Sequence, residues 1–262
     1  MMKGKIIKLL RLALLCMLVG SVGGFFSFLT LKNLQGQIPL SLYSNFQDYI
    51  APDLELSETE AIVRSRQSAV KMVSGVPSMW GGGMAYSSGT YFTANNGYYV
   101  VTVSHGLVGE CATTFAIYKE EFYACREIVI ADPVHDYAIL EVEKIPTRTP
   151  IVIPKDLPSP GEWKTSYSLL RKIIYTGYPN TIGPLTLRGD VVGFSGTEYM
   201  YVFSYAWGGS SGSGVFDENG NYVGYIIAID VGQTEFGIDV LENVVLVVPS
   251  FNIDWSSILK EQ

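Results

Sequence analysis

Short runs of alternating hydrophobic and polar residues, separated by turn residues, extend over most of the chain. This pattern is typical of closely spaced β-strands rather than of helices. It predicts strands over 67–74, 84–93, 98–104, 113–118, 122–130 and 137–142, and then over 173–178, 186–192, 200–205, 215–216, 222–229 and 244–248. Turn residues at Asn95-Asn96-Gly97 and Asn219-Gly220 favour two of the hairpins. The chain therefore divides into two groups of about six strands.

A proline-rich segment over 146–160 joins the two groups as an extended connection. Two such groups predict an all-β fold of two packed six-stranded β-barrels, the first over about 66–145 and the second over about 161–250. A capping-box pattern, Ser57-Glu58-Thr59-Glu60, predicts a short helix before the first strand. The residues over 251–260 predict a short C-terminal helix. A chain of 262 residues is long enough to bury a core of this kind.

The first 32 residues differ in composition from the rest of the chain, since they carry five basic residues and no acidic one. Within them, 12–31 contains no charged residue, and a helix of that length spans about 30 Å, the thickness of a bilayer core. Basic residues before such a helix favour a cytoplasmic N-terminus. We therefore expect a cytoplasmic basic end and a transmembrane signal-anchor in 1–32, a linker over 33–60, and a single-pass topology that places 61–262 on the extracytoplasmic side, periplasmic or extracellular.

A cleaved signal peptide is the alternative interpretation of the same segment. Its apolar region would end near Val19, with the small residues Ser21 and Gly23 at the cleavage site, and the domain would then be secreted. Cleavage there would leave a new N-terminus rich in exposed phenylalanine and leucine, beginning at Gly24. Because a soluble protein rarely begins in this way, we expect the anchor to remain uncleaved.

Charge is distributed unevenly along the chain, which has 18 basic and 25 acidic residues. With five of the basic residues in the first 32, residues 33–262 carry 13 basic against 25 acidic residues, a net charge of −12. Such an acidic surface argues against nucleic acid as a partner, because binding to phosphates requires basic side chains.

Metal catalysis also receives little support. The chain contains two histidines, His105 and His135, and no HExxH or CxxC motif, which is too few ligands for most zinc sites. The segment Asp217-Glu218-Asn219-Gly220 is typical of a hairpin turn rather than of a calcium loop. We therefore expect no metal and no cofactor.

Three cysteines are present, of which Cys16 lies in the apolar N-terminal run. The other two, Cys111 and Cys125, flank a predicted hairpin. An exported compartment would permit a disulfide between them, but the spacing of the two cysteines is equally compatible with two free thiols.

Glycine and serine dominate the segment Gly208-Gly209-Ser210-Ser211-Gly212-Ser213-Gly214, which is followed by apolar residues. Glycine permits backbone conformations that place free N–H groups beside a serine hydroxyl, and acyl transfer requires this combination of a nucleophile and oxyanion donors. By itself the segment is also typical of a surface turn.

Two further residues are candidates for the same chemistry. His105 follows an apolar strand and Asp136 opens one, although each residue alone is also typical of a structural position. His135 is the neighbour of Asp136, and because adjacent strand residues point to opposite faces we expect its side chain to face solvent.

The order of these residues discriminates between reaction frameworks. Residues 208–212 fit the G-x-S-x-G nucleophile elbow with Ser210 at its centre, but that framework requires the order Ser, acid, His, and no histidine follows Ser210. The subtilisin framework requires the order acid, His, Ser, and the only acidic residues before His105 lie in the predicted linker or the first helix. The remaining order, His105, Asp136, Ser211, is that of the chymotrypsin-like proteases.

At these residues the chain resembles the trypsin-fold serine proteases, and most closely the bacterial HtrA (high-temperature-requirement) type and the glutamyl endopeptidases. The resemblance covers about residues 61–255. Its main motifs are Gly97-Tyr98-Tyr99-Val100-Val101-Thr102-Val103-Ser104-His105, Asp132-Pro133-Val134-His135-Asp136-Tyr137-Ala138-Ile139-Leu140 and Gly209-Ser210-Ser211-Gly212-Ser213-Gly214, with weaker matches at Thr176-Gly177-Tyr178-Pro179, Gly189-Asp190-Val191-Val192 and Val247-Val248-Pro249-Ser250.

The resemblance implies a serine endopeptidase with polypeptide substrates, in which Ser211 is the nucleophile, His105 the general base and Asp136 its partner. It also implies an oxyanion hole formed by the N–H groups of Gly209 and Ser211. The pocket for the residue before the scissile bond would be lined by Tyr205, Ala206, Ile226, Ile227 and Ala228.

We expect an apolar residue at that position of the substrate. Position 205 is a tyrosine and not an acidic residue, so nothing there favours arginine or lysine in the substrate. The second barrel has no histidine to assist the recognition of glutamate.

Two departures from the family pattern stand out. Gly214 replaces the usual proline after the motif, and Ser210 replaces the usual Asp or Asn before the nucleophile. Without an Asp at that position, activation through a newly cut N-terminus is not expected. We also expect no PDZ module after the protease domain, whose last residue in the sequence is Gln262.

Two other functions remain open. One is a catalytically inactive double barrel that serves as a membrane-tethered binding module. The other is a viral or phage maturation protease that cleaves its own linker, over 33–56. The sequence leaves the oligomeric state open.

Overall fold

The computed structural model of the chain describes residues 56–76, 83–153, 157–234 and 237–259, without the side chains of 56–59 and 228–242. These residues belong to one compact unit, which begins at Ile50. The predicted anchor over 12–31 and most of the predicted linker lie outside the described residues. Among the helices that are described, none combines the length and the apolar character needed to cross a membrane.

The first half of the described chain forms a six-stranded antiparallel barrel, to which a seventh short strand is added. Its strands are β1 (Ala69–Val76), β2 (Gly83–Ala94), β3 (Gly97–Thr102), β4 (Thr114–Tyr118), β5 (Glu121–Asp132), β6 (Tyr137–Val142) and β7 (Ile151–Val152). They follow the order β1-β4-β5-β6-β3-β2, and pairing of β1 with β2 closes the ring. Strand β7 pairs in parallel with β2.

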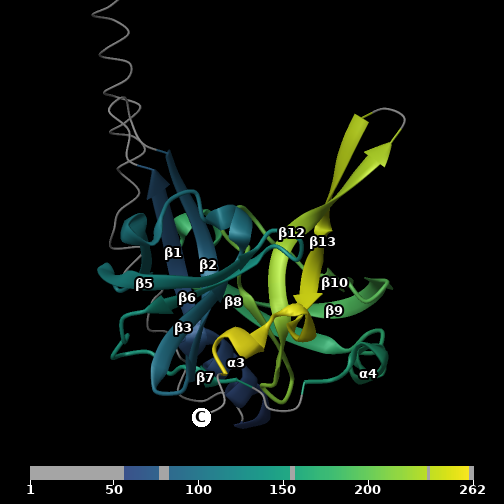
Figure 1. Cartoon of the computed structure of the whole chain (residues 1–262). Coiled ribbons are helices and arrows are strands. Elements are labelled where there is room, and N and C mark those ends of the chain that lie inside the picture. Colours follow the sequence, from purple (N-terminus) through teal and green to yellow (C-terminus); the bar gives the residue numbers. More distant parts are fainter. Residues whose placement is uncertain (1–55, 77–82, 154–156, 235–236, 260–262) are drawn as a thin grey trace, which may run out of the picture. The chain divides into compact units, whose positions relative to one another are not determined.

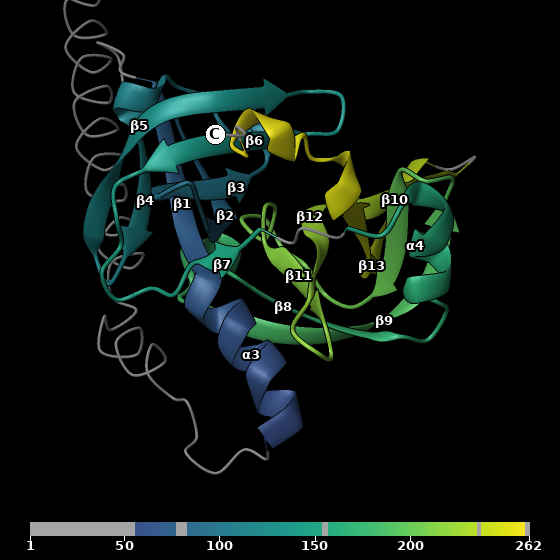
Figure 2. The same cartoon turned by 60° about the horizontal axis from the view of Figure 1, so that its bottom comes forward.

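The second half forms another closed antiparallel barrel (Figures 1 and 2). Its strands are β8 (Lys172–Gly177), β9 (Leu185–Ser195), β10 (Tyr199–Phe203), β11 (Gly214–Asp217), β12 (Tyr222–Thr234) and β13 (Gly237–Pro249), in the order β10-β13-β12-β11-β8-β9. The predicted architecture of two packed six-stranded barrels is therefore confirmed. Strands β12 and β13 are longer than predicted, since their register continues to the pair Thr234 and Gly237.

Turn chemistry explains the hairpin between β2 and β3 of the first barrel. Asn95 and Asn96 have φ angles of +46° and +64° and connect β2 to β3 directly after the pair Ala94 and Gly97. A two-residue hairpin loop with both central residues at positive φ matches the twist of the strands, and asparagine tolerates this conformation. The asparagine-glycine signal thus marks the correct hairpin, although the two asparagines form the loop and Gly97 begins β3.

Two helices lie beside the second barrel. The predicted helix is present as α3 (Leu56–Ser68), and its Ser65 hydroxyl donates to Thr176 Oγ1 of β8 at 2.8 Å. The segment over 146–160 was expected to be wholly extended, but a short helix, α4 (Pro160–Ser166), begins at its end. A capping box of Ser159 and Glu162, with proline at the first helical position, starts this helix.

The prediction of a continuous C-terminal helix over 251–260 is wrong. Residues Ser250–Asn252 and Trp255–Ser257 form two separate 3₁₀ turns. Between them Ile253 is extended, with φ −85° and ψ 127°. This break allows Ile253, Trp255 and Ile258 all to be buried, which a single helix face does not permit at this spacing.

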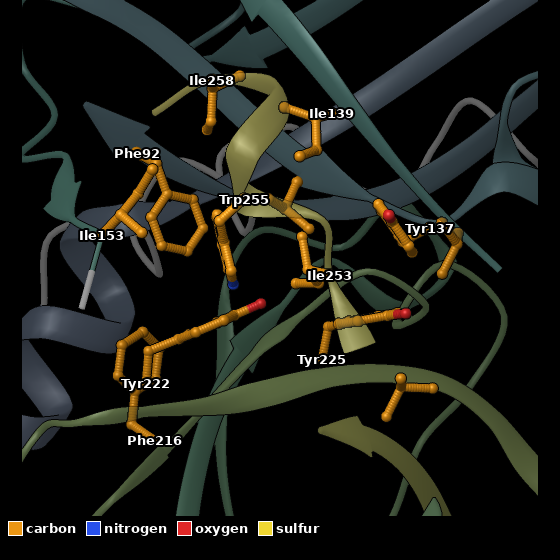
Figure 3. Packing of buried hydrophobic residues seen from close by; sticks show 13 residues of the cluster. Phe92, Tyr137, Ile139, Ile153, Phe216, Tyr222, Tyr225, Ile253, Trp255 and Ile258 are labelled. Carbon is orange, nitrogen blue, oxygen red and sulfur yellow. The ribbon is translucent and has the colours of Figure 1, made fainter. Parts of the chain in front are cut away.

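The core that joins the two barrels is largely aromatic (Figure 3). Phe92 of β2 packs against Tyr222 of β12 at a ring-centroid distance of 5.0 Å and against Trp255 at 5.2 Å. Phe216, Tyr225 and the C-terminal Ile253 and Ile258 complete the contact, together with Tyr137 and Ile139 of β6. Large buried aromatic side chains contribute much of a core's stability, so this cluster holds the barrels in a defined relative position.

A disulfide joins Cys111, in the turn before β4, to Cys125 in β5, with the two Cα atoms 5.3 Å apart. Of the two alternatives that the sequence leaves open, the structure has the disulfide. It closes a loop with a sequence separation of 14 and restricts the unfolded chain.

Candidate active site

His105 and Asp136 form a hydrogen-bonded pair at the ends of two neighbouring strands. His105 lies in the 3₁₀ turn Ser104–Gly106, two residues after β3, and Asp136 directly precedes β6. Antiparallel pairing of β3 with β6, which aligns Thr102 with Ala138, brings the two residues together. Asp136 Oδ2 lies 2.6 Å from His105 Nδ1, and Asp136 Oδ1 accepts the backbone N–H of His105 at 2.9 Å. Both carboxylate oxygens therefore orient the histidine.

The hydrogen bond that His105 makes to the Asp136 carboxylate raises the pKa of His105 above its ordinary value, and partial burial of the ring opposes this shift. A carboxylate at Nδ1 stabilises the imidazolium and leaves Nε2 as the basic atom of the neutral ring. The imidazole remains about half exposed, so Nε2 is accessible to a substrate.

The loop that carries Asp136 is fixed from both sides. Asp136 has φ +56°, a conformation that aspartate adopts more readily than most residues. The Asp132 carboxylate accepts the N–H of Val134 at 2.7 Å and lies 2.8 Å from His135 Nδ1. From the second barrel, the Tyr225 hydroxyl donates to the His135 carbonyl at 2.7 Å. His135 is thus paired with Asp132 and partly exposed, and it takes a structural place in this loop.

All four carbonyl groups of residues 208–211 accept hydrogen bonds. The donors are Asn180 N to Gly208 O (2.6 Å), Ser88 Oγ to Gly209 O (2.7 Å), Ser213 N and Oγ to Ser210 O (3.0 and 2.6 Å), and Ser88 N to Ser211 O (2.8 Å). In a trans peptide the carbonyl of one residue and the N–H of the next residue point in opposite directions. These bonds therefore also set the directions of the N–H groups of residues 209–212.

The N–H groups of Gly209 and Ser211 have no hydrogen-bond acceptor within the described part of the chain. Gly209 has φ +94°, and a Cβ atom at this position would lie 2.7 Å from Tyr178 O, so only glycine fits the backbone here. The structure thus presents both predicted oxyanion donors with their N–H groups unpaired, on either side of Ser210.

The Ser211 hydroxyl does not bind His105 in this structure. Ser211 Oγ donates to the Ile227 carbonyl of β12 at 2.9 Å, and no hydrogen bond joins Ser211 to His105 among the described residues. Rotation about the Cα–Cβ bond moves a serine hydroxyl between staggered positions. In unliganded enzymes the catalytic hydrogen bonds often form only when substrate binds, so this geometry leaves Ser211 a candidate nucleophile.

The residues predicted to line a substrate pocket lie in different environments. Tyr205 is 50% exposed and stacks on Trp207, with ring centroids 6.1 Å apart. Its carbonyl accepts a hydrogen bond from the Tyr175 hydroxyl. Ala206 and Ile226 are buried in the core of the second barrel, and the side chain of Ala228 lies outside the described residues. Of the predicted set, Tyr205 and the partly exposed Ile227 are therefore accessible.

Several residues of this site were not identified from the sequence. They are Ser88 and Asn180, which bind the loop of residues 208–214 that carries the candidate nucleophile Ser211, called the nucleophile loop below. Ser88 lies 121 residues before Gly209, whose carbonyl it binds, and Asn180 lies 28 residues before Gly208, whose carbonyl it binds. Neither belongs to a motif that a single sequence reveals. In the described residues there is no cluster of three or more His, Cys, Asp or Glu side chains arranged to bind a metal ion.

Comparison with known proteins relates the chain to peptidases. Residues 87–224 match the family model of the trypsin-like peptidase domain, and no curated protein sequence matches the chain. Solved structures similar to it include the following three. The serine endoprotease from Yersinia pestis is 16% identical, with a TM-score of 0.55 over 76% of this chain and 64% of its own. The Rv3671c protease from M. tuberculosis, in its active form, is 17% identical, with a TM-score of 0.57 over 80% of this chain and 88% of its own.

The HtrA-type protease AlgW with decapeptide is 15% identical, with a TM-score of 0.55 over 75% of this chain and 65% of its own. At these identities the similarity shows the fold alone. The chain spans slightly less than two thirds of the Yersinia and AlgW structures.

Proposed function

Since the chain belongs to the trypsin-like peptidase domain family, we propose that it is a serine endopeptidase that uses His105, Asp136 and Ser211. Family and fold support this class of enzyme. The single observation that carries the assignment of residues is the pair of His105 and Asp136, joined at 2.6 Å in the barrel that also binds the nucleophile loop.

In the proposed reaction, Ser211 Oγ attacks the carbonyl carbon of the scissile peptide bond while His105 Nε2 accepts the hydroxyl proton. The carbonyl oxygen becomes an oxyanion, stabilised by the N–H groups of Gly209 and Ser211, each worth about 3–4 kcal/mol in the transition state. His105 then delivers its proton to the leaving amine. Water, activated by the same histidine, hydrolyses the acyl-enzyme, releases the carboxylate product and restores the Ser211 hydroxyl.

This sequence of steps requires a movement of the Ser211 side chain. The Ser211 hydroxyl must turn from the Ile227 carbonyl toward His105 before it can transfer its proton. The backbone around it is held by hydrogen bonds to each carbonyl of 208–211, and the N–H groups of Gly209 and Ser211 have no other acceptor in the described chain.

An apolar residue before the scissile bond is part of the proposal. The stacked, half-exposed rings of Tyr205 and Trp207 present an apolar surface next to the nucleophile loop, and Tyr205 carries no charge that would attract lysine or arginine. A peptide library cleaved mainly after leucine, phenylalanine or similar residues supports this preference. Cleavage mainly after Lys, Arg or Glu contradicts it.

Membrane anchoring through 12–31, with the protease domain on the extracytoplasmic side, is proposed from the sequence pattern. The disulfide between Cys111 and Cys125 supports an oxidising compartment for the domain. Protease protection of the full chain in membrane vesicles tests the topology, since the domain should be accessible from the extracytoplasmic side alone.

Labelling with a fluorophosphonate probe tests the proposed chemistry. The full chain in detergent should become labelled, and Ser211→Ala and His105→Ala should abolish labelling. Ser74→Ala removes a buried hydroxyl that bonds Thr114 and Gly109 instead of residues 208–211, so this variant should remain labelled. Labelling that persists in Ser211→Ala overturns the assignment of the nucleophile. A folded wild-type chain that is neither labelled nor active on any peptide of the library supports the inactive binding module instead.

A further inference from the structure

Ser88, in β2 of the first barrel, makes two hydrogen bonds to the nucleophile loop. It is fully buried. Its backbone N–H donates to Ser211 O at 2.8 Å, and its hydroxyl donates to Gly209 O at 2.7 Å. The same hydroxyl accepts the N–H of Tyr178 at 2.8 Å, and its carbonyl accepts the Thr102 hydroxyl at 2.7 Å. All four hydrogen-bonding groups of the residue are therefore used.

From this arrangement we propose that Ser88 is a positioning residue that holds both oxyanion donors in place. The inference rests on the proposed peptidase function. The carbonyls that Ser88 binds, Gly209 O and Ser211 O, lie on either side of the peptide that carries the Ser211 N–H. With both neighbouring peptides fixed, the Ser211 N–H cannot turn away from the substrate carbonyl.

The hydroxyl of Ser88 also links the nucleophile loop to the turn that fixes the other oxyanion donor. It accepts the Tyr178 N–H, and Tyr178 directly precedes the 3₁₀ turn Pro179–Thr181. Within that turn, Asn180 N donates to Gly208 O at 2.6 Å and so directs the Gly209 N–H. One side chain of the first barrel thus connects the supports of both donors, which belong to the second barrel.

Close packing leaves little alternative to this geometry. A Cβ atom on Gly177 would approach the Ser88 hydroxyl to 3.0 Å, and a Cβ atom on Gly212 would collide with the Ser88 carbonyl. Glycine at both positions lets the two segments meet, and the Ser88 hydroxyl lies between the Tyr178 N–H and the Gly209 carbonyl and bonds both.

Removal of the hydroxyl leaves the Tyr178 N–H and the Gly209 carbonyl without their partner in a buried place. Because Gly209 is a glycine, its peptides can rotate to relieve this unpaired state, and rotation displaces the oxyanion donors. Such a change weakens binding of the transition state more than binding of the substrate. Ser88→Ala should therefore lower kcat by roughly 10- to 100-fold, somewhat less than complete loss of a donor.

Ser74→Ala is the matched control. Ser74 lies in β1 of the same barrel, is equally buried, and has a hydroxyl that bonds Thr114 Oγ1 at 2.9 Å and accepts the Gly109 N–H at 3.0 Å. It makes no hydrogen bond to the nucleophile loop. Both variants lose a buried serine hydroxyl with two hydrogen bonds, so a general loss of stability should affect them alike.

The test measures two properties of each variant. The first is kcat and KM on a fluorogenic peptide selected from a library. The second is the inhibition constant of the corresponding peptide boronate, which binds the serine as a tetrahedral adduct. The full chain in detergent is used throughout. In Ser88→Ala we expect the inhibition constant to rise by the same factor as kcat falls, with KM within about twofold and an unchanged pH midpoint, because the His105–Asp136 pair is untouched. In Ser74→Ala kcat and the inhibition constant should stay within about twofold of wild type.

A fall in kcat no larger than in Ser74→Ala overturns the proposal, and so does a fall in kcat without loss of boronate affinity. If Ser88→Ala does not fold, hydrogen exchange of the wild-type chain decides. The amides of Tyr178 and Ser88 should be protected, and those of Gly209 and Ser211 should exchange rapidly until the boronate binds. Rapid exchange at Tyr178 contradicts the proposal.

These outcomes separate the two hypotheses. A wild-type chain that is inactive and unlabelled by the fluorophosphonate contradicts the peptidase function itself. An active wild type with an unaffected Ser88→Ala variant contradicts only the role of Ser88.

Discussion

Asp136 binds His105 with both carboxylate oxygens, one at the imidazole Nδ1 and the other at the backbone N–H, at 2.6 and 2.9 Å. The second bond connects the carboxylate to the turn that carries the histidine. Orientation of the ring therefore depends on Asp136 in two ways, through the side chain and through the main chain.

Asp136→Asn should lower kcat by about 10⁴, as expected for a serine protease triad, because an amide favours the wrong imidazole tautomer. The amide oxygen can still accept the backbone N–H, so folding should be preserved. Steady-state kinetics on the library peptide, with circular dichroism as the control for folding, measure the effect. A loss of less than tenfold would remove Asp136 from the mechanism.

The pH dependence of activity should reflect the raised pKa of His105. His105 acts as a base only when neutral, so kcat/KM should rise with pH, with a midpoint above the ordinary histidine value of about 6.5. The same raised pKa adds to the free energy of unfolding below about pH 6.5. This contribution to stability is lost as pH rises through the pKa of His105 in the folded state. A midpoint at or below 6.5 in wild type would contradict the contribution of Asp136 to the pKa of His105.

Gly209→Ala should reduce kcat by at least about 100-fold, because the new Cβ would lie 2.7 Å from Tyr178 O and displace an oxyanion donor. Gly196→Ala is the control, since Gly196 also has a positive φ, of +55°, but has no atom within 4 Å of a Cβ at that position. Both variants place an alanine at a positive φ and should be destabilised for that reason, but only Gly209→Ala should lose activity. Equal activity of the two variants would show that packing at Gly209 is unimportant for catalysis.

Replacement of both Cys111 and Cys125 by serine should lower the free energy of unfolding by about 3 kcal/mol, as expected for a loop of this length. Guanidinium unfolding monitored by fluorescence measures this change. Wild type treated with a reductant should show the same decrease, because it lacks the same cross-link. Unchanged stability in both samples would mean that the disulfide does not constrain the unfolded chain.

Comparison of sequence and structure shows which features are local. The hairpin at Asn95 and Asn96 and the strands on either side follow from residues that lie close together in the chain, through side-chain alternation and turn chemistry. Helix α3 is present where the local sequence predicts a helix, but it begins at Leu56, before Ser57, which the capping-box pattern predicts as the N-cap. Helix α4 was missed although Ser159, Pro160 and Glu162 form a capping box, since the surrounding prolines favour an extended chain. The C-terminal turns were mistaken for a helix because burial of Ile253 and Trp255 against the barrels decides their conformation.

Two strand groups, the order of His105, Asp136 and Ser211, and the glycines around Ser211 can be identified without coordinates, because hydrophobic period, turn residues and residue order are properties of the linear chain. The contacts of Ser88 and Asn180 with the nucleophile loop, and the hydrogen bond from the Ser211 hydroxyl to the Ile227 carbonyl, are known from the folded chain alone. These bonds join strands and turns distant in sequence, and their partners are set by how the barrels close and pack. A hydrogen bond of this kind leaves no periodic pattern in the chain, so residue order alone does not reveal it.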